Sequence, residues 1–598
     1  MKKLTALLLA LIMAFSAFAM LGYADGQPVT AYVAQYDETE GDVDRVVNWY
    51  EVNGKYYIFI PASIDCDTAK FYVSGSNVTV NGAAYTEAKS LTEAFGEKTE
   101  AAVVSDGVTY NVVILKESKV ASVFIATESG SLDAIHADKS HKEKGFIEIV
   151  NADGEIEYDG VLDQIKGRGN STWEMEKKPY NIKLDKKTNL FGMGKSKKWS
   201  LIANHGDASL IRNALAYEAA KRAGMEYTPL FVPVDVYING NYEGAYLLTT
   251  RIEVDETRID IQNLEDANEK ANPEVKDIEA LPRGGAYGKY AGLLENTMKW
   301  VEIPNDPEDI TGGYVIEMEL ANRYAGEVSG FVTSRSQPFT MKSPEYASKA
   351  QMEYISSYYQ KVEDAIYASV DMSELNEILD VESMAQMYLI NEWCSNMDAS
   401  LTSTYFYKPV GEPLHAGPVW DFDIAFGNND LDRFGNDYTD PYKWTVCYNR
   451  MYRNTVFGKW DVEEKPTIYN VICKNGDFIA KADRVWFDYM EKAVKETITY
   501  IGGDYVNALE GSAVANAIRW NIFGTTDVET IEDKFEAETA SVLQFARTKA
   551  STISSGIGQV QNNAPETNFV VKAFKGILVG VNNLFEKAIV LFGLENME

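Results

Sequence analysis

The sequence predicts an α+β protein in three parts: a small all-β module, a β-rich lobe and a larger helical lobe. Short β-type runs separated by Gly, Asn and Asp turns dominate residues 29–120, and helical periodicity dominates from about residue 346 onward. Strand-like runs around one clear helix occupy much of the region between. With 45% hydrophobic and 24% charged residues, the 598-residue chain has the composition of an ordinary globular protein.

Charge and cysteine content exclude several classes of function. The formal net charge of −33 argues against a nucleic-acid partner, because a phosphate backbone needs a concentrated Lys/Arg surface. The four Cys and four His show no CxxC, HxH or HExxH spacing, so a zinc site is not expected. Any metal ion is expected to be a hard cation on carboxylate oxygens.

The N-terminus has the pattern of a secretory signal. Lys2 and Lys3 precede the apolar run Leu4–Ala19, which ends well before the polar segment Asp25–Pro28. We therefore predict a signal peptide over residues 1–24, a secreted, extracellular or cell-surface location, and no transmembrane span.

Residues 25–118 are predicted to form a small all-β, sandwich-like module with antiparallel strands. Its strand-like runs are Tyr56–Ile60, Phe71–Val73, Val78–Val80 and Tyr110–Ile114. Turns such as Asn53-Gly54 and Asn81-Gly82 separate them. The module carries no obvious chemistry, so we interpret it as an accessory or spacer module.

A β-rich small lobe is predicted over about residues 119–310. Five short strands surround one helix, which is capped by Asp207 or Ser209 and closed by Gly224. The predicted strands are Val161–Lys166, Tyr180–Leu184, Trp199–Ala203, Val234–Ile238 and Gly244–Thr249. Asn239-Gly240-Asn241 joins the last two as a hairpin.

A larger helical lobe is predicted over about residues 311–555, after Gly312-Gly313 and the strand Tyr314–Leu320. The predicted helices are Tyr346–Val370, Met372–Leu379, Val381–Cys394, Asp477–Ile501, Val506–Trp520 and Thr530–Ser554. Two strand-like segments, Ser403–Lys408 and His415–Asp421, interrupt them. A β-rich lobe, a Gly-containing hinge and a helical lobe are the outline of a two-lobed, kinase-like fold.

Residues 556–598 are predicted to form a polar linker and an amphipathic C-terminal helix. Apolar residues from Phe574 to Phe592 fall on one helical face. Since the polar face is not basic, we expect this helix to pack on the protein or on a partner rather than on a membrane.

The first candidate site is the Gly-rich run Gly167, Arg168, Gly169, Asn170, Ser171 and Thr172. Its glycines let backbone N–H groups approach an anion such as phosphate, although a plain tight turn is the alternative. Alternation places Lys183 on the strand face opposite Ile182 and Leu184, where a lysine can hold nucleotide phosphates. Glu218 in the next helix is a candidate ion-pair partner for Lys183; the alternative is a solvated helix charge.

The second candidate site is the acidic pair of segments Asn396–Asp398 and Trp420–Asp423. Asp398 follows an apolar helix, and Asp421 ends the apolar run Gly417–Trp420, where an unpaired carboxylate would be costly. Three interpretations stay open. These are a kinase base with a Mg²⁺ ligand, a glycosidase carboxylate pair, and a structural ion-pair network.

A series of motifs resembles the spore-coat-protein-H (CotH) family of secreted kinases. The matching motifs are Ile165–Trp173, Lys178–Leu184, Leu190–Met193, Lys197–Trp199, Leu210–Asn213, Tyr237–Gly240, Gly244–Leu248, Gly312–Tyr314 and Gly417–Asp423. They run in the family's order over about residues 122–554, so a CotH kinase-like domain is expected over residues 119–555.

The resemblance implies an atypical, protein-kinase-like two-lobed fold that uses ATP and Mg²⁺ to phosphorylate Ser/Thr on secreted or surface proteins. It implies that Asp398 is the catalytic aspartate and that Asp421, with Asp423 beside it, holds the metal. Gly167 to Thr172 and Lys183 would lie at the nucleotide. Two alternatives stay open: a kinase-like surface binding or adhesion protein without catalysis, and a glycan-active enzyme.

Two other patterns are weaker. Asn428–Gly435 resembles half a calcium loop, but Phe434 stands where a third ligand would be needed. His415 is expected to be a packed histidine rather than a neighbour of a metal ligand.

Overall fold

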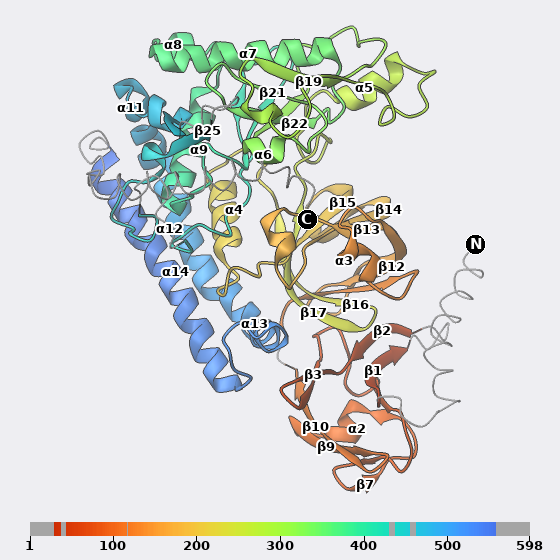
Figure 1. The fold of residues 1–598 in the computed structure, drawn as a ribbon. Coiled ribbons are helices and arrows are strands. Elements are labelled where there is room, and N and C mark those ends of the chain that lie inside the picture. Colours follow the sequence, from red (N-terminus) through yellow and green to blue (C-terminus); the bar gives the residue numbers. More distant parts are fainter. Residues whose placement is uncertain (1–28, 37–42, 117, 430–436, 455–461, 558–598) are drawn as a thin grey trace, which may run out of the picture. The chain divides into compact units, whose positions relative to one another are not determined.

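A computed structural model describes residues 29–36, 43–116, 118–429, 437–454 and 462–557 (Figure 1). The predicted signal peptide, almost all of the C-terminal segment and most of the half calcium loop lie outside the described residues. The chain is a mixed α+β protein, as predicted. It divides into two compact units that do not follow the chain in order. The kinase-like arrangement of two lobes stays a prediction.

We call the first compact unit the barrel unit and the second the helical unit. The barrel unit consists of Met1–Ile211, Leu230–Arg251 and Tyr500–Ala540. The helical unit consists of Arg212–Pro229, Ile252–Thr499 and Ser541–Glu598. The one helix predicted for the small lobe, now Arg212–Arg222, therefore belongs to the helical unit. The predicted helix Val506–Trp520 of the large lobe belongs to the barrel unit.

The all-β module contains two sheets, in the orders β2-β1-β5-β8 and β3-β4-β10-β9-β6-β7. Its elements are β1 (Ala31–Tyr36), β2 (Val43–Asn48), β3 (Tyr50–Val52), β4 (Lys55–Phe59), β5 (Lys70–Val73), β6 (Thr79–Val80), β7 (Ala83–Ala84), β8 (Lys89–Ser90), α2 (Leu91–Phe95), β9 (Glu100–Ser105) and β10 (Val108–Leu115). The expectation of purely antiparallel strands was wrong, because β4 and β10 pair in parallel. Side chains from both sheets share one core, as in a sandwich.

A closed barrel of seven strands follows the module, in the order β11-β12-β13-β14-β15-β17-β16. Its strands are β11 (Ala121–Thr127), β12 (Glu143–Val150), β13 (Ile156–Gly167), β14 (Tyr180–Asn189), β15 (Lys195–Ile202), β16 (Phe231–Ile238) and β17 (Asn241–Thr250), with α3 (Asp133–Ala137) between β11 and β12. The five predicted strands were too few, since β11 and β12 were missed. The parallel pair β11 and β16 closes the ring.

The module and the barrel share a hydrophobic core. Phe124 and Tyr237 of the barrel belong to the same apolar cluster as Phe59 and Val112 of the module. The Tyr237 hydroxyl donates to the Phe59 carbonyl over 3.0 Å. Removing the module would therefore expose buried aromatic side chains of the barrel, which a detachable spacer would not do.

Helix α13 (Val506–Trp520) packs on barrel strand β17 and completes a buried polar network. The fully buried Lys177 ammonium donates to the Ala203 carbonyl over 2.8 Å and to Asn516 Oδ1 of α13 over 2.7 Å. It also donates to the Ala245 carbonyl. Burial lowers the pKa of Lys177 well below its ordinary value. Burial also raises the pKa of Asp235, which accepts from Ser512 of α13, to about 6.

The helical unit contains a seven-stranded sheet in the order β18-β19-β21-β22-β20-β23-β24. Its strands are β18 (Arg283–Gly285), β19 (Thr297–Val301), β20 (Tyr314–Met318), β21 (Gly330–Val332), β22 (Pro338–Ser343), β23 (Thr404–Lys408) and β24 (His415–Ala416), and β25 (Arg450–Asn454) pairs separately with β26 (Val462–Pro466). The predicted strand His415–Asp421 was too long. The chain leaves the sheet after Ala416, so Asp421 lies in a loop.

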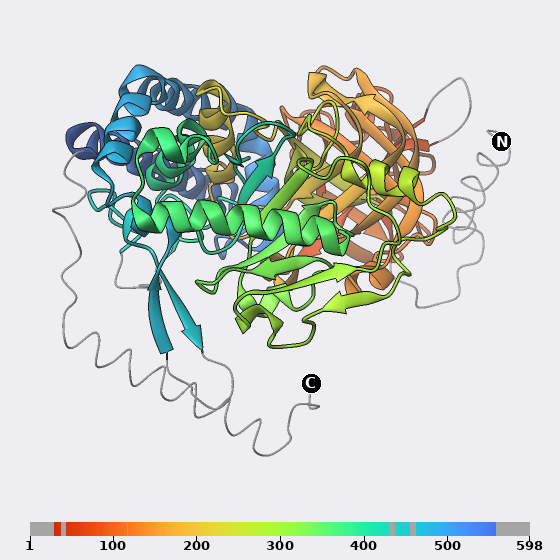
Figure 2. The same ribbon diagram turned by 90° about the horizontal axis from the view of Figure 1, so that it is seen from above.

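The helical unit also contains several helices. They are α4 (Arg212–Arg222), α5 (Leu264–Ala271), α6 (Ala321–Tyr324), α7 (Lys349–Ala368), α8 (Met372–Leu375), α9 (Val381–Cys394), α10 (Ile468–Ile472), α11 (Gly476–Val485) and α12 (Glu491–Tyr500), and α14 (Val528–Gly556) runs through both units. A capping box of Ser348 and Gln351 starts α7, which packs on β19 and β21 (Figure 2). The predicted helix Met372–Leu379 is shorter, and π-helical turns interrupt the predicted helix Asp477–Ile501.

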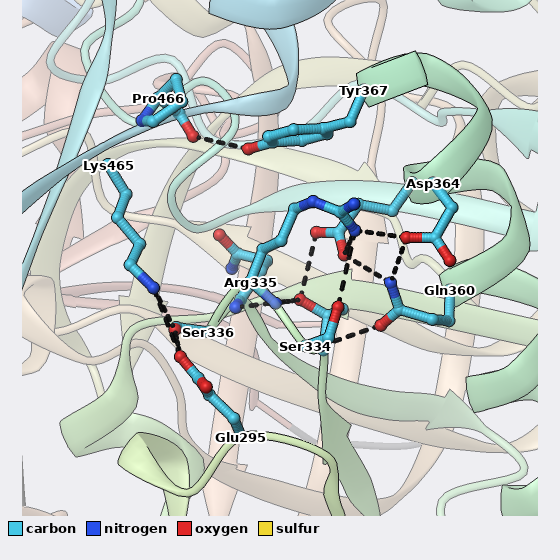
Figure 3. Close-up of polar contacts among 12 residues, drawn as sticks. Glu295, Ser334, Arg335, Ser336, Gln360, Asp364, Tyr367, Lys465 and Pro466 are labelled. Atoms are coloured by element: carbon cyan, nitrogen blue, oxygen red, sulfur yellow. Dashed lines mark hydrogen bonds and ion pairs between the residues drawn. The ribbon is translucent and has the colours of Figure 1, made fainter.

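A polar cluster fastens α7 to the turn between β21 and β22 (Figure 3). Arg335 in that turn contacts the carboxylates of Glu363 and Asp364 at 3.2 and 2.5 Å and lies over the Tyr367 ring. Lys465 of β26 contacts Glu295 at 3.3 Å. The cluster ties four segments of the chain: Glu295, the β21–β22 turn, α7 and β26.

Two further findings concern cysteines and membranes. All four cysteines are free thiols, and Cys394, Cys447 and Cys473 are buried. Within the described part of the chain, no helix has both the length and the apolarity needed to span a bilayer.

Candidate functional site

The Gly-rich turn follows barrel strand β13 and leads into the short 3₁₀ helix Ser171–Glu174. The local structure requires glycine at both positions. A Cβ on Gly167 would lie 2.5 Å from the Trp173 ring, and Gly169 has a left-handed φ of 85°. The alternative interpretation, a tight turn that requires glycine, therefore explains both glycines without a ligand.

The surroundings of this turn are nevertheless suited to an anion. Asn170 and Ser171 are exposed, and the first N–H groups of a 3₁₀ helix have no partner within the helix. The Lys139 ammonium donates to the Gly169 carbonyl over 2.8 Å, and Lys178 donates to the Trp173 carbonyl over 2.6 Å. Neither lysine was named as a site candidate; for Lys178 the available signal was the adjacent Lys177-Lys178 pair.

Lys183 lies on the outer face of β14, opposite the buried Ile182 and Leu184, as the alternation predicted. Its ammonium is 3.4 Å from the Asp163 carboxylate, and both side chains are about two-fifths exposed (39% and 38%). A ligand phosphate would have to compete with Asp163 for Lys183.

Glu218 is buried in α4, so the alternative of a solvated helix charge was wrong. Its carboxylate lies 2.7 Å from Arg222 and 4.0 Å from Lys221 of the same helix. Glu218 and Lys183 belong to different units, and their predicted pairing stays a prediction.

Asp398 lies in the loop directly after α9, as predicted. The helix starts at the N-cap Asp380 and ends at Ser395, whose φ of 48° turns the chain away. In residues 391–400 only Asp398 is half-buried, and the rest are buried. The loop is fixed from within by Asn396, which accepts from the Asp398 N–H over 3.1 Å, and from outside by Asn449, which donates to the Ala399 carbonyl over 3.0 Å.

A fully buried ion pair supports the helix that carries this loop. Glu392 on α9 and Lys549 on α14 are 2.7 Å apart, and both side chains are 0% exposed. The same carboxylate accepts from the N–H groups of Thr445 and Val446 over 2.8 Å each. A lone carboxylate in the apolar run Tyr388–Cys394 was the signal for this pair, and it was not used.

Asp421 has a left-handed backbone, with φ of 66°. Its half-buried carboxylate accepts from the Ser403 hydroxyl over 3.3 Å. Within the described part of the chain, no lysine or arginine forms an ion pair with it. Of the run Gly417–Trp420, which was predicted to be buried, Gly417–Val419 is buried and Trp420 is half-buried. A carboxylate that emerges from a buried segment without a counter-ion is suited to an external cation.

Comparison with known protein families gives one match. A family model described as CotH kinase protein matches residues 165–553, about two thirds of the chain. The chain belongs to the CotH kinase family. No curated protein matches it.

The CotH match contains the Gly-rich turn, Lys183, α4 and both acidic loops. The match begins at residue 165, near the C-terminal end of β13. The all-β module, β11, β12 and most of β13 therefore lie before it. The region of this chain that carries the candidate residues is therefore the region shared with the CotH kinase family.

The acidic loops fit a magnesium ion only together with phosphate oxygens. Among the residues that the structure describes, no group of three or more His, Cys, Asp or Glu side chains could hold a metal ion. Mg²⁺ is commonly held by one or two carboxylates and substrate phosphates, with water completing the shell. Asp421 supplies one carboxylate that has no cationic partner among the residues described. The half-buried Asp423 stands two residues away, and its carbonyl accepts from Asn428 over 2.7 Å.

Two buried glutamates near these loops were also missed. Glu319 accepts from the Thr402 hydroxyl over 2.7 Å, close to the Asp398 loop. Glu317 pairs with Lys342 at 2.8 Å. Glu317 lies in β20, and Glu319 comes directly after it. The run Tyr314–Leu320 was predicted as a strand, but no role was assigned to its two carboxylates. His415 stacks on Tyr407 at 4.9 Å and is a packed histidine, as predicted.

Proposed function

We propose that this CotH-family protein is a secreted, atypical Ser/Thr protein kinase that transfers the ATP γ-phosphoryl group to extracellular or surface proteins with Mg²⁺. The observation that carries the proposal is Asp421. Its carboxylate lies on a loop after a buried segment and has no cationic partner among the described residues. Membership in the CotH kinase family supports the reaction class.

Each candidate residue then has a role. Gly167 to Thr172 and Lys183 contact the phosphates of ATP, and Glu218 supports the lysine. Asp421 and Asp423 would hold Mg²⁺, which when bound neutralises charge on the phosphate oxygens. Asp398 orients the acceptor hydroxyl and takes its proton as the oxygen bonds to the γ-phosphorus and the bond to ADP breaks.

The test measures nucleotide binding and phosphoryl transfer separately. Purified protein is incubated with γ-labelled ATP, Mg²⁺ and the secreted proteins of the same source. Calorimetry then measures binding of a Mg²⁺-bound, non-hydrolysable ATP analogue. Asp421→Asn should abolish Mg²⁺-dependent binding and keep the fold, whereas Asp488→Asn, at an exposed position of the same unit, should change neither.

The outcomes separate the proposal from its alternatives. If Asp421→Asn binds the Mg²⁺-bound analogue like the wild type, Asp421 is not the metal ligand. If it unfolds, Asp421 has a structural role, for example through its contact with the Ser403 hydroxyl, rather than a role as metal ligand. Nucleotide binding without any transfer would favour the non-catalytic binding protein, and no response to Mg²⁺ and nucleotide would favour the glycan-active enzyme.

A further inference from the structure

Helix α4 is the structural neighbour of the Asp421 loop within the helical unit. All residues from Arg212 to Ala220 are buried, including its polar ones. Buried polar side chains need hydrogen-bond partners, and those of α4 find several of them in the backbone around Asp421. The motif Leu210–Asn213, which the proposed reaction leaves without a role, begins this helix.

Three side chains of α4 contact the backbone of residues 421–425. The Asn213 Oδ1 atom accepts from the Phe422 N–H over 2.8 Å. The Tyr217 hydroxyl oxygen accepts from the Asp421 N–H over 3.4 Å, a longer and weaker bond. Arg212 Nε donates to the Ala425 carbonyl over 3.1 Å.

The aromatic ring of Tyr217 also packs against the same loop. It stacks on Trp420 with centroids 6.1 Å apart and meets Phe422 edge-on at 6.2 Å. The residues on both sides of Asp421 are therefore packed against one ring. This packing is apolar and does not depend on the hydrogen bonds.

The left-handed backbone of Asp421 needs such support. For a residue other than glycine this conformation costs roughly 1–2 kcal/mol, somewhat less for Asp than for most. It persists where the surroundings over-determine it. In the shortest of the three hydrogen bonds, Asn213 Oδ1 accepts from the Phe422 N–H. This bond fixes the peptide unit that directly follows Asp421 and so restrains the backbone that carries the carboxylate.

We propose that Asn213 is a positioning residue that aims the Asp421 carboxylate at a divalent cation. This inference rests on the proposed function, because it takes Asp421 as the metal ligand. Asn213 does not touch the cation; it accepts the Phe422 N–H and so keeps Asp421 in the conformation that presents its carboxylate.

The test compares variants that remove or keep the acceptor. Asn213→Leu has a similar volume without an acceptor, and Asn213→Asp keeps the acceptor oxygen. Calorimetric titration with the Mg²⁺-bound, non-hydrolysable ATP analogue should show about a tenfold or greater loss of affinity for Asn213→Leu and a change within about threefold for Asn213→Asp. Tyr217→Phe keeps the ring and loses the 3.4 Å bond, so its change should also stay within about threefold.

The dependence on Mg²⁺ concentration separates positioning from damage to the fold. Excess Mg²⁺ should restore most of the nucleotide binding of Asn213→Leu, since a misaimed ligand weakens the metal site but does not remove it. If this variant does not fold, Asn213→Ser carries the same expectation, because it removes the amide without adding carbon atoms.

Two results distinguish the failure of this inference from the failure of the proposed function. If Asp421→Asn loses Mg²⁺-dependent binding while Asn213→Leu and Asn213→Ser bind like the wild type, the positioning role is wrong and the metal ligand stands. If Asp421→Asn itself binds like the wild type, the proposed function fails, and with it the role of Asn213.

Discussion

The two candidate regions are held in place in different ways. The Gly-rich turn of the barrel unit is fixed by residues such as Trp173 and Lys139, which lie no more than 30 positions from it in the chain. The acidic loops of the helical unit are fixed by distant ones. Asn213 is 209 residues from Phe422, and Lys549 is 157 residues from Glu392.

The conformation of the Gly-rich turn therefore depends on residues nearby in the sequence, whereas that of the acidic loops depends on residues far away in the sequence. A turn that its own glycines and neighbours hold should respond only to changes nearby. Loops that a buried helix and a buried ion pair hold should respond to substitutions far away in sequence. The two regions also differ in charge pairing. Among the described residues Asp421 has no cationic partner and so is suited to a metal ion, whereas Lys183 of the first region already pairs with Asp163.

The largest expected effect tests whether the well-anchored loop carries the chemistry. Asp398→Asn should lower turnover by roughly 10²–10⁴, the usual scale for removing a general base, and should keep Mg²⁺-nucleotide affinity within a few-fold. Steady-state kinetics and calorimetry measure the two quantities. Near-normal turnover would remove Asp398 from the mechanism, and a joint loss of both quantities would make it a metal ligand.

The next effect tests anchoring from a distance. Lys549→Met should destabilise the protein by about 3–5 kcal/mol, because it leaves the 0% exposed Glu392 without its cation. Chemical denaturation measures the free energy of unfolding. Lys492→Met is the matched control, since Lys492 is 80% exposed in its pair with Glu496 and should change stability little. Equal stability of the two variants would contradict distributed anchoring.

A smaller effect tests the local anchoring of the turn. Gly167→Ala should destabilise the barrel unit by about 1–3 kcal/mol, because its Cβ would lie 2.5 Å from the Trp173 ring. Gly476→Ala, at a position with nothing within 4 Å, should be neutral or slightly stabilising. Thermal unfolding compares the two. A stable Gly167→Ala variant that has lost nucleotide affinity would show that the glycine serves the ligand rather than the fold.

The smallest expected change in stability separates binding from folding at Lys183. Its pair with Asp163 is about two-fifths exposed, so Lys183→Met should alter the free energy of unfolding by less than about 1 kcal/mol. Affinity for the ATP analogue should nevertheless fall about tenfold if Lys183 contacts phosphate. Lys55→Met, in the exposed pair with Glu100, is the control. Unchanged affinity would leave the turn without its proposed lysine.

Local pattern predicted much of the fold because it reports local geometry. The alternation of Tyr180, Ile182 and Leu184 gave β14 and the outward position of Lys183. Ser348 and Gln351 start α7 close to its predicted start. The barrel was underestimated because β11 is an almost continuous apolar run that is buried against both the barrel and the module, and such a strand shows no alternation.

The sequence predicted the candidate site residues but not the residues that hold them in place. Asp398 and Asp421 stand out in sequence because each is an acidic residue next to an apolar run. Their supports do not stand out, because Asn213, Asn449 and Lys549 act through contacts with residues far along the chain. The shared core of the module and the barrel was missed for the same reason: it depends on Phe124 and Tyr237 meeting Phe59, which no local pattern records.

Helix α13 has a consequence for how the protein is made. Asn516 completes the oxygen shell of the buried Lys177 ammonium, and 339 residues separate the two. A ribosome that adds roughly 5–20 residues per second needs on the order of 20–70 s to synthesise that interval. During this time the nascent barrel holds a lysine without one of its partners and an uncovered surface along β17. The barrel therefore reaches its native state only after α13 has been synthesised, 339 residues after Lys177.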